Sequence, residues 1–508
     1  MQRKQLTLVI VSLLVVVLSV SLAYFTAQII GKGKDVSVTS ANLQIVFTDS
    51  DGALTETDIE PGWSATKTFT IKNDTKTEYK YNIVIKDLVN TFVTNGYLQY
   101  KITTTNGGYN MTEFKDIPKS SAPKDTILAY SVSIPVGVTQ SYTIEFKYAN
   151  DESVDQSDDM GKKLSGTLFI TEGTEQPTLL SQILNDNPTR STRSNNNNGT
   201  NDFATTLTTT TTGTLFTSTE SITGITDTPK EVYYYAGNTT NNWVKFANIY
   251  WRIIRTNHDS SIRLLYVGTS HDTTTGNIGT SLFNQNYDSP KYVGYKYGED
   301  TSLDTIRNNT TDSTIKTTID TWYQNNLTNY TKYLSTSAVY CNDRSEGTGQ
   351  TYSASADFNF APYYRMDYDT DGAKANPSYN CTNIKDAFSV DNTSAKLDYP
   401  VSLMKADEIA FAGGVAFQNM STPYAWFISN SAGTQVSTDW WSLSPIYWVG
   451  SFAYVWYWFS GFAYLLNYFV YITIAVRPAI SLKSCIKYST GNGTYETPYE
   501  IVETSSGC

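Results

Sequence analysis

"SPIYWVGSFAYVWYWFSGFAYLLNYFVYITIAVRP", residues Ser444–Pro478, has no charged side chain before Arg477 and an aromatic residue at nearly every second or third position. Three interpretations are open: a membrane span, a buried core, or a surface that binds something. About 30 uncharged residues are enough to cross a bilayer as a helix. Spanning helices, however, are rich in Leu, Ile and Val and keep Trp and Tyr at the interfaces, whereas here aromatics fill the whole run. A second, C-terminal span therefore remains only as an alternative.

A simple core also fits this run poorly. Each aromatic side chain buries roughly 150–250 Å², so packing all of them needs a large apolar partner surface from a chain rich in Thr, Asn and Ser. Some of the rings must then stay exposed, and a contiguous apolar area beyond a few hundred Å² marks a binding surface in a soluble protein. Tyr and Trp also suit such a surface, because they give a large contact area with few rotatable bonds. We therefore expect a ligand-binding face here.

The first residues predict export. In "MQRKQLTLVIVSLLVVVLSVSLAYFT", Arg3 and Lys4 precede an apolar stretch, the layout of an exported segment with its basic end inside. Residues 1–34 are either a cleaved signal, with small residues at Ser21 and Ala23, or a membrane anchor of sufficient length. Both remain open. The rest of the chain is expected outside the cell, at the surface or secreted, with the membrane as a partner only through this segment.

Charge and composition exclude several function classes. The formal net charge is -11, so a polyanion is repelled and nucleic acid is not expected as a partner. The two histidines, His258 and His271, are too few for most His-based acid/base or zinc chemistry. No enzyme activity and no obligatory cofactor are expected.

Four cysteines remain, and an even count in an exported chain favours disulfides. Three connectivities are possible. Proximity along the chain favours Cys341 with Cys381 and Cys485 with Cys508. As the last residue, Cys508 has the alternative of staying free or pairing between molecules.

Residues 35–174 show short stretches of alternating apolar and polar residues, such as "SYTIEFKY", separated by turns. About seven such stretches at regular spacing predict an all-β sandwich, which we interpret as a stalk. The segment "SLAYFT", followed by "PGWSATKTFTIKN" and "YKYNIVI", resembles the camelysin and biofilm-matrix-fibre family of exported bacterial β-sandwiches. This resemblance implies an alternative function, that of an adhesive fibre or matrix subunit.

Residues 175–229 are dominated by Thr, Asn, Ser and Gly and predict a linker. The second domain, residues 230–508, is expected to be α+β. It begins with a strand meander and contains a helix capped by Asp312 or Ser313, followed by a shorter one over Met404–Gly414.

A short acidic motif, "DYDTDG", places Asp367, Asp369 and Asp371 on alternate residues before Gly372. This spacing is that of a calcium loop, but Ser378 stands where such a loop has its bidentate Glu. A weak Ca²⁺ site and a plain solvated loop are the two interpretations.

The segments "YWRIIRTN", "STSAVYCNDRS", "YPVSLMKADEIAFAGG", "WWSLSP" and "AVRPAISL" together resemble the C-type-lectin-like domains, related to the formylglycine-generating enzyme fold, that diversity-generating retroelements mutate. The likeness covers about residues 232–499. It implies a fixed scaffold and a C-terminal ligand face randomised by adenine-specific copying. The implied ligand is an unknown protein or glycan on another cell, phage or host surface.

The genetic code adds a check. An AAC codon whose adenines are replaced can encode Tyr, Phe, Ile, Val or Leu, but never Trp. Within a variable region of about residues 446–475, the ligand-binding positions expected on this basis are Ile446, Tyr447, Val449, Phe452, Tyr454, Tyr457, Phe459, Phe462, Tyr464, Leu466, Tyr468, Phe469, Tyr471, Ile472 and Ile474, with Asn467 an unchanged site. The scaffold positions expected are Trp440, Trp441, Ser444, Pro445, Trp448, Trp456, Trp458, Gly461, Val476, Arg477 and Pro478.

Two departures from the family are informative. The formylglycine-generating relatives oxidise a substrate cysteine with a pair of active-site cysteines, whereas the aromatic run has none and Cys485 lies beyond it. Family ligand faces also commonly mix in Asn, Ser and Asp. This aromatic-rich copy predicts an apolar or sugar-ring target.

Overall fold

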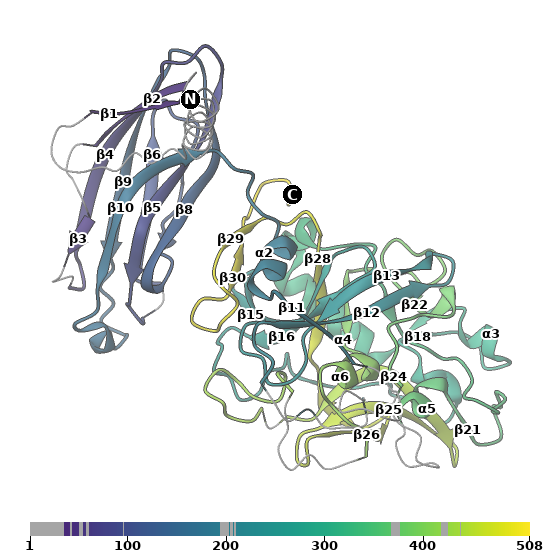
Figure 1. Ribbon diagram of the computed structural model, residues 1–508. Helices are drawn as coiled ribbons and strands as arrows, with labels where there is room; N and C mark the ends of the chain where they lie inside the picture. Colours follow the sequence, from purple (N-terminus) through teal and green to yellow (C-terminus); the bar gives the residue numbers. More distant parts are fainter. Residues whose placement is uncertain are drawn as a thin grey trace, which may run out of the picture. The chain divides into compact units, whose positions relative to one another are not determined.

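The computed structural model describes residues 35–40, 43–49, 54–56, 60–94, 96–193, 203, 207, 210–366, 376–417, 425–436 and 438–508, with backbone alone for residues 35–56. The chain forms two units, Met1–Gln176 and Pro177–Cys508, and both are built mainly of β-strands (Figure 1). The predicted export segment, residues 1–34, lies outside the described residues. Among the residues that are described, no helix has the length and apolar character needed to cross a bilayer.

The first unit is a two-layer β-sandwich, as predicted. One sheet has the order β1 (Asp35–Ser40), β2 (Leu43–Asp49), β4 (Ser64–Asn73), β9 (Thr139–Tyr148), β6 (Leu98–Thr104) and β7 (Lys115–Asp116). The other has the order β3 (Leu54–Glu56), β10 (Leu164–Glu172), β5 (Tyr79–Asn90) and β8 (Ser120–Ile134). A short 3₁₀ helix, η1 (Ser157–Asp159), precedes β10. Alternate residues of β9, such as Tyr142, Ile144 and Phe146, are buried against side chains of the second sheet, because strand side chains point to opposite faces in turn.

The larger sheet of the second unit has ten strands. Its main path is β11 (Thr189–Thr192), β12 (Thr214–Ile222), β13 (Thr226–Tyr234), β15 (Ile249–Thr256), β14 (Trp243–Phe246), β30 (Tyr499–Ile501) and β29 (Tyr488–Thr490). β16 (Ile262–Gly268) pairs with β15 and β28 (Pro478–Leu482), and β28 also pairs with β23 (Val401–Leu403). The expected meander is thus present as β14, β15 and β16.

The smaller sheet of the second unit contains the aromatic run. Its order is β17 (Thr280–Leu282), β27 (Thr473–Ala475), β24 (Trp440–Val449), β25 (Phe452–Phe459) and β26 (Tyr464–Phe469), and β21 (Phe358–Asn359) also pairs with β24. Two small sheets complete the unit, β18 (Lys296–Tyr297) with β19 (Thr311–Asp312) and β20 (Tyr340–Cys341) with β22 (Ala387–Phe388). The aromatic run therefore forms strands rather than a spanning helix.

The helices of the second unit are α2 (Leu179–Asp186), α3 (Leu303–Ile306), α4 (Thr314–Asn326), α5 (Ala361–Met366) and α6 (Ala406–Phe411), with the 3₁₀ helices η2 (Pro290–Val293), η3 (Thr328–Tyr333) and η4 (Ile384–Asp386). Both predicted helices are confirmed. Ser313 caps α4 by accepting a hydrogen bond from the backbone N–H of Lys316. The shorter helix, α6, is buried along its whole length.

The linker predicted over residues 175–229 needs correction. This range contains α2, β11, β12 and the start of β13, and the two units divide between Gln176 and Pro177. Leu179, Ile183 and Leu215 are at most 2% exposed in the main core of the second unit. A few well-placed apolar side chains are enough to order a Thr-rich segment when a larger core is available to bury them.

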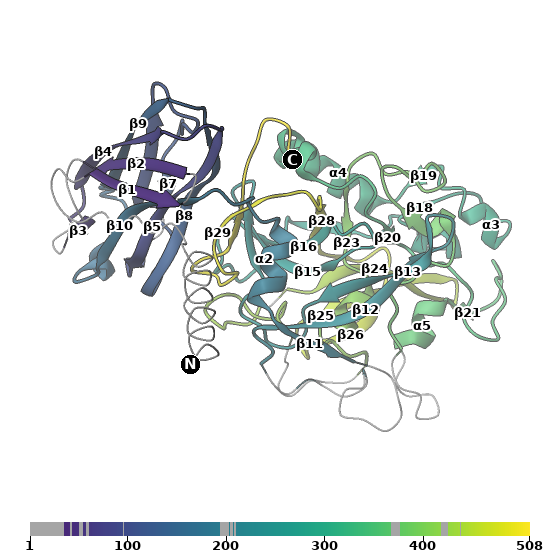
Figure 2. The same ribbon diagram turned by 45° about the horizontal axis from the view of Figure 1, so that its top comes forward.

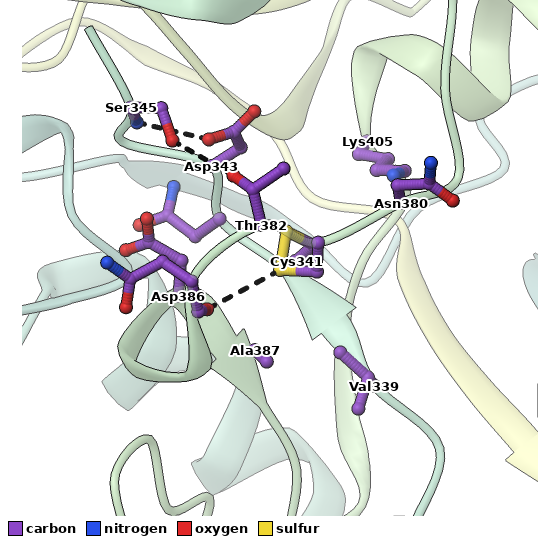
Figure 3. Close-up of a disulfide and its surroundings, with 12 residues drawn as sticks. Val339, Cys341, Asp343, Ser345, Asn380, Thr382, Asp386, Ala387 and Lys405 are labelled. Atoms are coloured by element: carbon purple, nitrogen blue, oxygen red, sulfur yellow. Dashed lines mark hydrogen bonds between the residues drawn. A yellow bond between two sulfur atoms is a disulfide. The ribbon is translucent and has the colours of Figure 1, made fainter. Parts of the chain in front are cut away.

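Both predicted disulfides are present, and they fit an extracellular setting. Cys341 is bonded to Cys381 and Cys485 to Cys508, which leaves no free cysteine. Figure 3 shows the first bridge beside Val339 and Ala387, and the bridge packs in a small apolar cluster with these residues and Ile222. The bridge thus ties β20 to the segment that precedes η4, and Cys381 itself pairs with the end of β12.

A buried ionic network joins the large sheet to α6. Arg255 on β15 donates to Glu220 on β12 and to Glu408 on α6, at 2.8 Å in each case. Arg263 on β16 also bonds Glu408, at 2.5 Å. Burial by itself would raise the pKa of Glu408, but Arg263 and Arg255 outweigh it and lower this pKa to about 2. The network therefore depends on a carboxylate that stays ionised in the folded protein.

This network predicts acid sensitivity of the second unit. Because the pKa of Glu408 is depressed in the folded protein, its ionised carboxylate contributes up to roughly 3 kcal/mol to the free energy of unfolding. This contribution is fully present above the unfolded pKa of about 4.3 and is lost as the pH falls toward 2. Urea denaturation followed by tryptophan fluorescence between pH 7 and 3 measures the stability of the second unit, because every tryptophan except Trp63 lies in that unit. We expect the free energy of unfolding of Glu408→Gln to depend less steeply on pH than that of the wild type. An equal dependence of the free energy of unfolding on pH in both proteins would contradict a stabilising role of the ionised Glu408. If Glu408→Gln does not fold, Glu220→Gln gives the same comparison.

Candidate ligand-binding surface

The three strands of the aromatic run are held by buried indoles. Trp448, Trp456 and Trp458 are at most 3% exposed. The ring of Trp458 packs edge-on against Phe427 at 4.8 Å, and that of Trp456 lies 5.1 Å from Phe417. These indoles fix strands β24, β25 and β26 on the core of the second unit, with β21 and α5 alongside (Figures 1 and 2).

Two turns join these strands. Between β24 and β25 only Gly450 and Ser451 intervene, and both have positive φ, 59° and 66°. This is the backbone pattern of a type I′ hairpin, which matches the twist of the strands that it joins. The second turn, between Phe459 and Tyr464, carries Phe462 at its tip, 53% exposed.

Carboxylates hold both turns. Asp357 accepts a hydrogen bond from the N–H of Gly450 at 2.8 Å. Asp439 accepts from both the N–H and the hydroxyl of Ser460, each at 2.8 Å. The ends of the hairpins are therefore pinned in place by bonds to neighbouring segments.

Aromatic rings on these strands contact one another in a connected series, which we name the aromatic surface. Its members lie on both faces of β25 and β26, with Tyr454 and Phe469 paired on one face and Phe459 and Tyr464 on the other. Its partly or wholly exposed members are Tyr287, Tyr363, Tyr447, Phe452, Tyr454, Phe459, Phe462, Tyr464, Tyr468, Phe469 and Tyr471. Neighbouring rings lie 4.5–6.2 Å apart between centroids. Tyr457, which is buried, joins its two halves through contacts with Tyr468 and Phe459. Offset and edge-on ring pairs of this kind stabilise each other, so the surface is pre-arranged.

Most of the predicted ligand-binding residues lie at this surface or beside it. Partly or wholly exposed are Tyr447, Val449, Phe452, Tyr454, Phe459, Phe462, Tyr464, Leu466, Tyr468, Phe469, Tyr471, Ile472 and Ile474. Ile446 and Tyr457 need correction, because they are only 0% and 4% exposed and belong to the supporting core. Alternation along a strand does not reveal this, since irregular pairing of β24 with β25 shifts the register between Trp441 and Tyr447.

The expected scaffold residues are buried, with one exception. Trp440, Trp441, Ser444, Val476 and Arg477 are at most 2% exposed. Gly461 is exposed in the second turn. The guanidinium of Arg477 bonds the backbone carbonyls of Tyr266 and Phe427, so the first charge after the run points into the core.

Two members of the surface come from outside the predicted region. Tyr287 stacks on Phe452 at 5.2 Å and contacts Tyr471 at 4.6 Å. Tyr363, on α5, lies 6.0 Å from Tyr447. No local sequence signal marks either residue, because only the tertiary fold brings them to β24 and β25.

The hydroxyls of Tyr447 and Tyr454 are neutral donors. Burial, and then the neighbouring Tyr454 and Tyr363, hold the pKa of Tyr447 above its usual range. Burial likewise raises the pKa of Tyr454. At these two positions the surface thus offers ring faces and uncharged hydroxyl groups.

Metal chemistry finds little support in the described residues. The predicted calcium ligands Asp367, Asp369 and Asp371 lie outside them. Asp312, Asp320 and Asp398 do converge, but the ammonium of Lys316 sits among their carboxylates at 2.5–3.1 Å and already provides the positive charge.

Comparisons of this chain with protein-family models, with curated proteins and with solved structures gave no match.

Proposed function

We propose that this chain is an exported surface protein whose second unit binds a ligand non-covalently through the aromatic surface. The observation that carries this proposal is the connected series of partly or wholly exposed rings beside a frame of buried tryptophans. Exposed apolar area of this kind is costly in water unless a partner covers it. Rigid aromatic side chains also lose little conformational entropy on binding, which makes them effective contact residues.

Burial supports the further proposal that a diversity-generating retroelement varies this surface on a C-type-lectin-like scaffold. Trp cannot arise from an AAC codon by adenine replacement, and the three tryptophans within the run are all buried. Most residues that can arise in this way are partly or wholly exposed. Selection for a stable frame and variation of the exposed positions would produce this division.

The remaining features fit a surface receptor without catalysis. The disulfides suit an extracellular location, and the first unit would act as a stalk. The partner would be a protein or glycan of another cell, phage or host, and the net charge of -11 argues against nucleic acid.

A displayed library of random twelve-residue peptides tests the binding proposal. We expect the purified protein to select peptides that no longer bind Tyr454→Ala/Phe462→Ala/Tyr464→Ala. Tyr457 is left intact in this variant because it is buried, so the thermal midpoint should stay within a few degrees of the wild type.

The matched control is Val136→Ala/Met160→Ala, which removes exposed apolar side chains from the first unit. This control variant should still bind every selected peptide. Selection of peptides that bind the triple variant equally well, or no selection at all, would contradict a ligand-binding role for the aromatic surface.

The gene sequence tests the diversification proposal. We expect the codons of the exposed variable positions to end in C, as descendants of AAC do. We also expect a near-copy of the segment that differs mainly at adenines, close to a reverse-transcriptase gene. Third bases drawn at random, with no such copy nearby, would rule out retroelement diversification while leaving ligand binding untouched.

A further inference from the structure

In the part of the chain that the structure describes, no cation–ring contact involves the aromatic surface, although this protein pairs cations with rings elsewhere. Arg252 lies 4.4 Å from the ring of Trp243, Arg255 4.4 Å from Tyr379, and Lys147 3.8 Å from Phe114. Among the described residues, every such contact uses a ring outside the aromatic surface. Residues 440–476 contain no Lys or Arg. Apart from Tyr363, the rings of the aromatic surface therefore have faces that no Lys or Arg of the described residues covers.

Carboxylates, in contrast, stand at the rim. Asp357 is bonded at the turn that precedes β25, and Asp439 at the turn that follows it. Asp288 is exposed next to Tyr287, whose ring stacks on Phe452 at the start of β25. The eight residues of β25 span about 26 Å, so acidic groups flank both ends of an extended row of rings.

We propose that the partner of the aromatic surface is a polypeptide segment rich in Arg and Lys. Its cationic side chains lie over the Tyr and Phe rings, and their charges face the carboxylates at the rim. A small organic cation would fill one cage of rings, whereas rings spread over three strands suit several side chains of one segment. This inference rests on the proposed function and names the chemistry of the ligand.

Electrostatics favours this pairing at two ranges. A guanidinium over a ring is attracted by the ring's quadrupole, and Arg forms such contacts more often than Lys. At longer range the net charge of -11 attracts a basic partner and speeds its encounter, an effect that salt screens.

Defined peptides test the inference on the full-length protein. The probes are three fluorescein-labelled twelve-residue peptides that alternate Ser with Arg, Lys or Glu. Their binding is measured by fluorescence anisotropy at 50 and 500 mM salt. We expect the Arg peptide to bind at least tenfold more tightly than the Glu peptide, with the Lys peptide between them. Phe462→Ala/Tyr464→Ala should weaken Arg-peptide binding at least tenfold even at 500 mM salt, where simple charge attraction is screened.

Matched charge variants distinguish the effect of the rim carboxylates on peptide binding from the effect of the net charge. Asp288→Asn/Asp357→Asn should weaken Arg-peptide binding several-fold at 50 mM salt, and the amide oxygen introduced at position 357 still offers Gly450 an acceptor. Glu152→Gln/Asp158→Asn removes the same charge from exposed positions of the first unit and should have little effect.

Three results would overturn the inference: equal affinity for the Glu peptide, no loss in the ring variant, or equal losses in the two charge variants. If the random library still yields ring-dependent binders and these are neutral or acidic, the basic partner is excluded while ligand binding by the surface stands.

Discussion

Burial of the tryptophan side chains in β24 and β25 is the constraint on which the aromatic surface depends. Trp456 and Trp458 are two residues apart and are both inaccessible to solvent. Because strand side chains alternate between faces, a slip of one residue would move both indoles out of their buried positions. The cost of exposing such large apolar groups is several kcal/mol each. The same frame can therefore carry many different exposed residues without losing its register.

The rest of the second unit stiffens this frame with polar and covalent links. The network of Arg255, Arg263, Glu220 and Glu408 joins the large sheet to α6, whose Ala406 N–H in turn bonds Ser444 on β24. The Cys341–Cys381 bridge fixes two segments that are 40 residues apart. A buried charge network costs desolvation energy, but its directional bonds admit few alternative arrangements. A rigid support suits a surface whose contacts depend on the relative positions of many rings.

Local sequence signals were sufficient for part of this structure. The alternation in "SYTIEFKY" correctly indicated β9, the Ser313 cap correctly placed the start of α4, and proximity correctly paired the cysteines. The Thr-rich composition of residues 175–229 led to the wrong prediction of a linker, because α2 and β12 are ordered by a core that local composition does not reveal. Tyr457 and Tyr287 show the same limit. Tyr457 is buried between Trp441 of β24 and Tyr468 of β26, and chain folding brings Tyr287 to the surface from a distant part of the sequence.

Ligand binding by the aromatic surface requires that its rings are accessible to solvent while the neighbouring indoles are not. Hydroxyl-radical footprinting with mass spectrometry, corrected for the intrinsic reactivity of each side chain, measures this directly on the intact protein. We expect stronger labelling of Phe462, Tyr464 and Tyr454 than of Trp456 and Trp458. Protection of all five residues, or labelling of the tryptophans in preference to the other rings, would contradict an accessible aromatic surface.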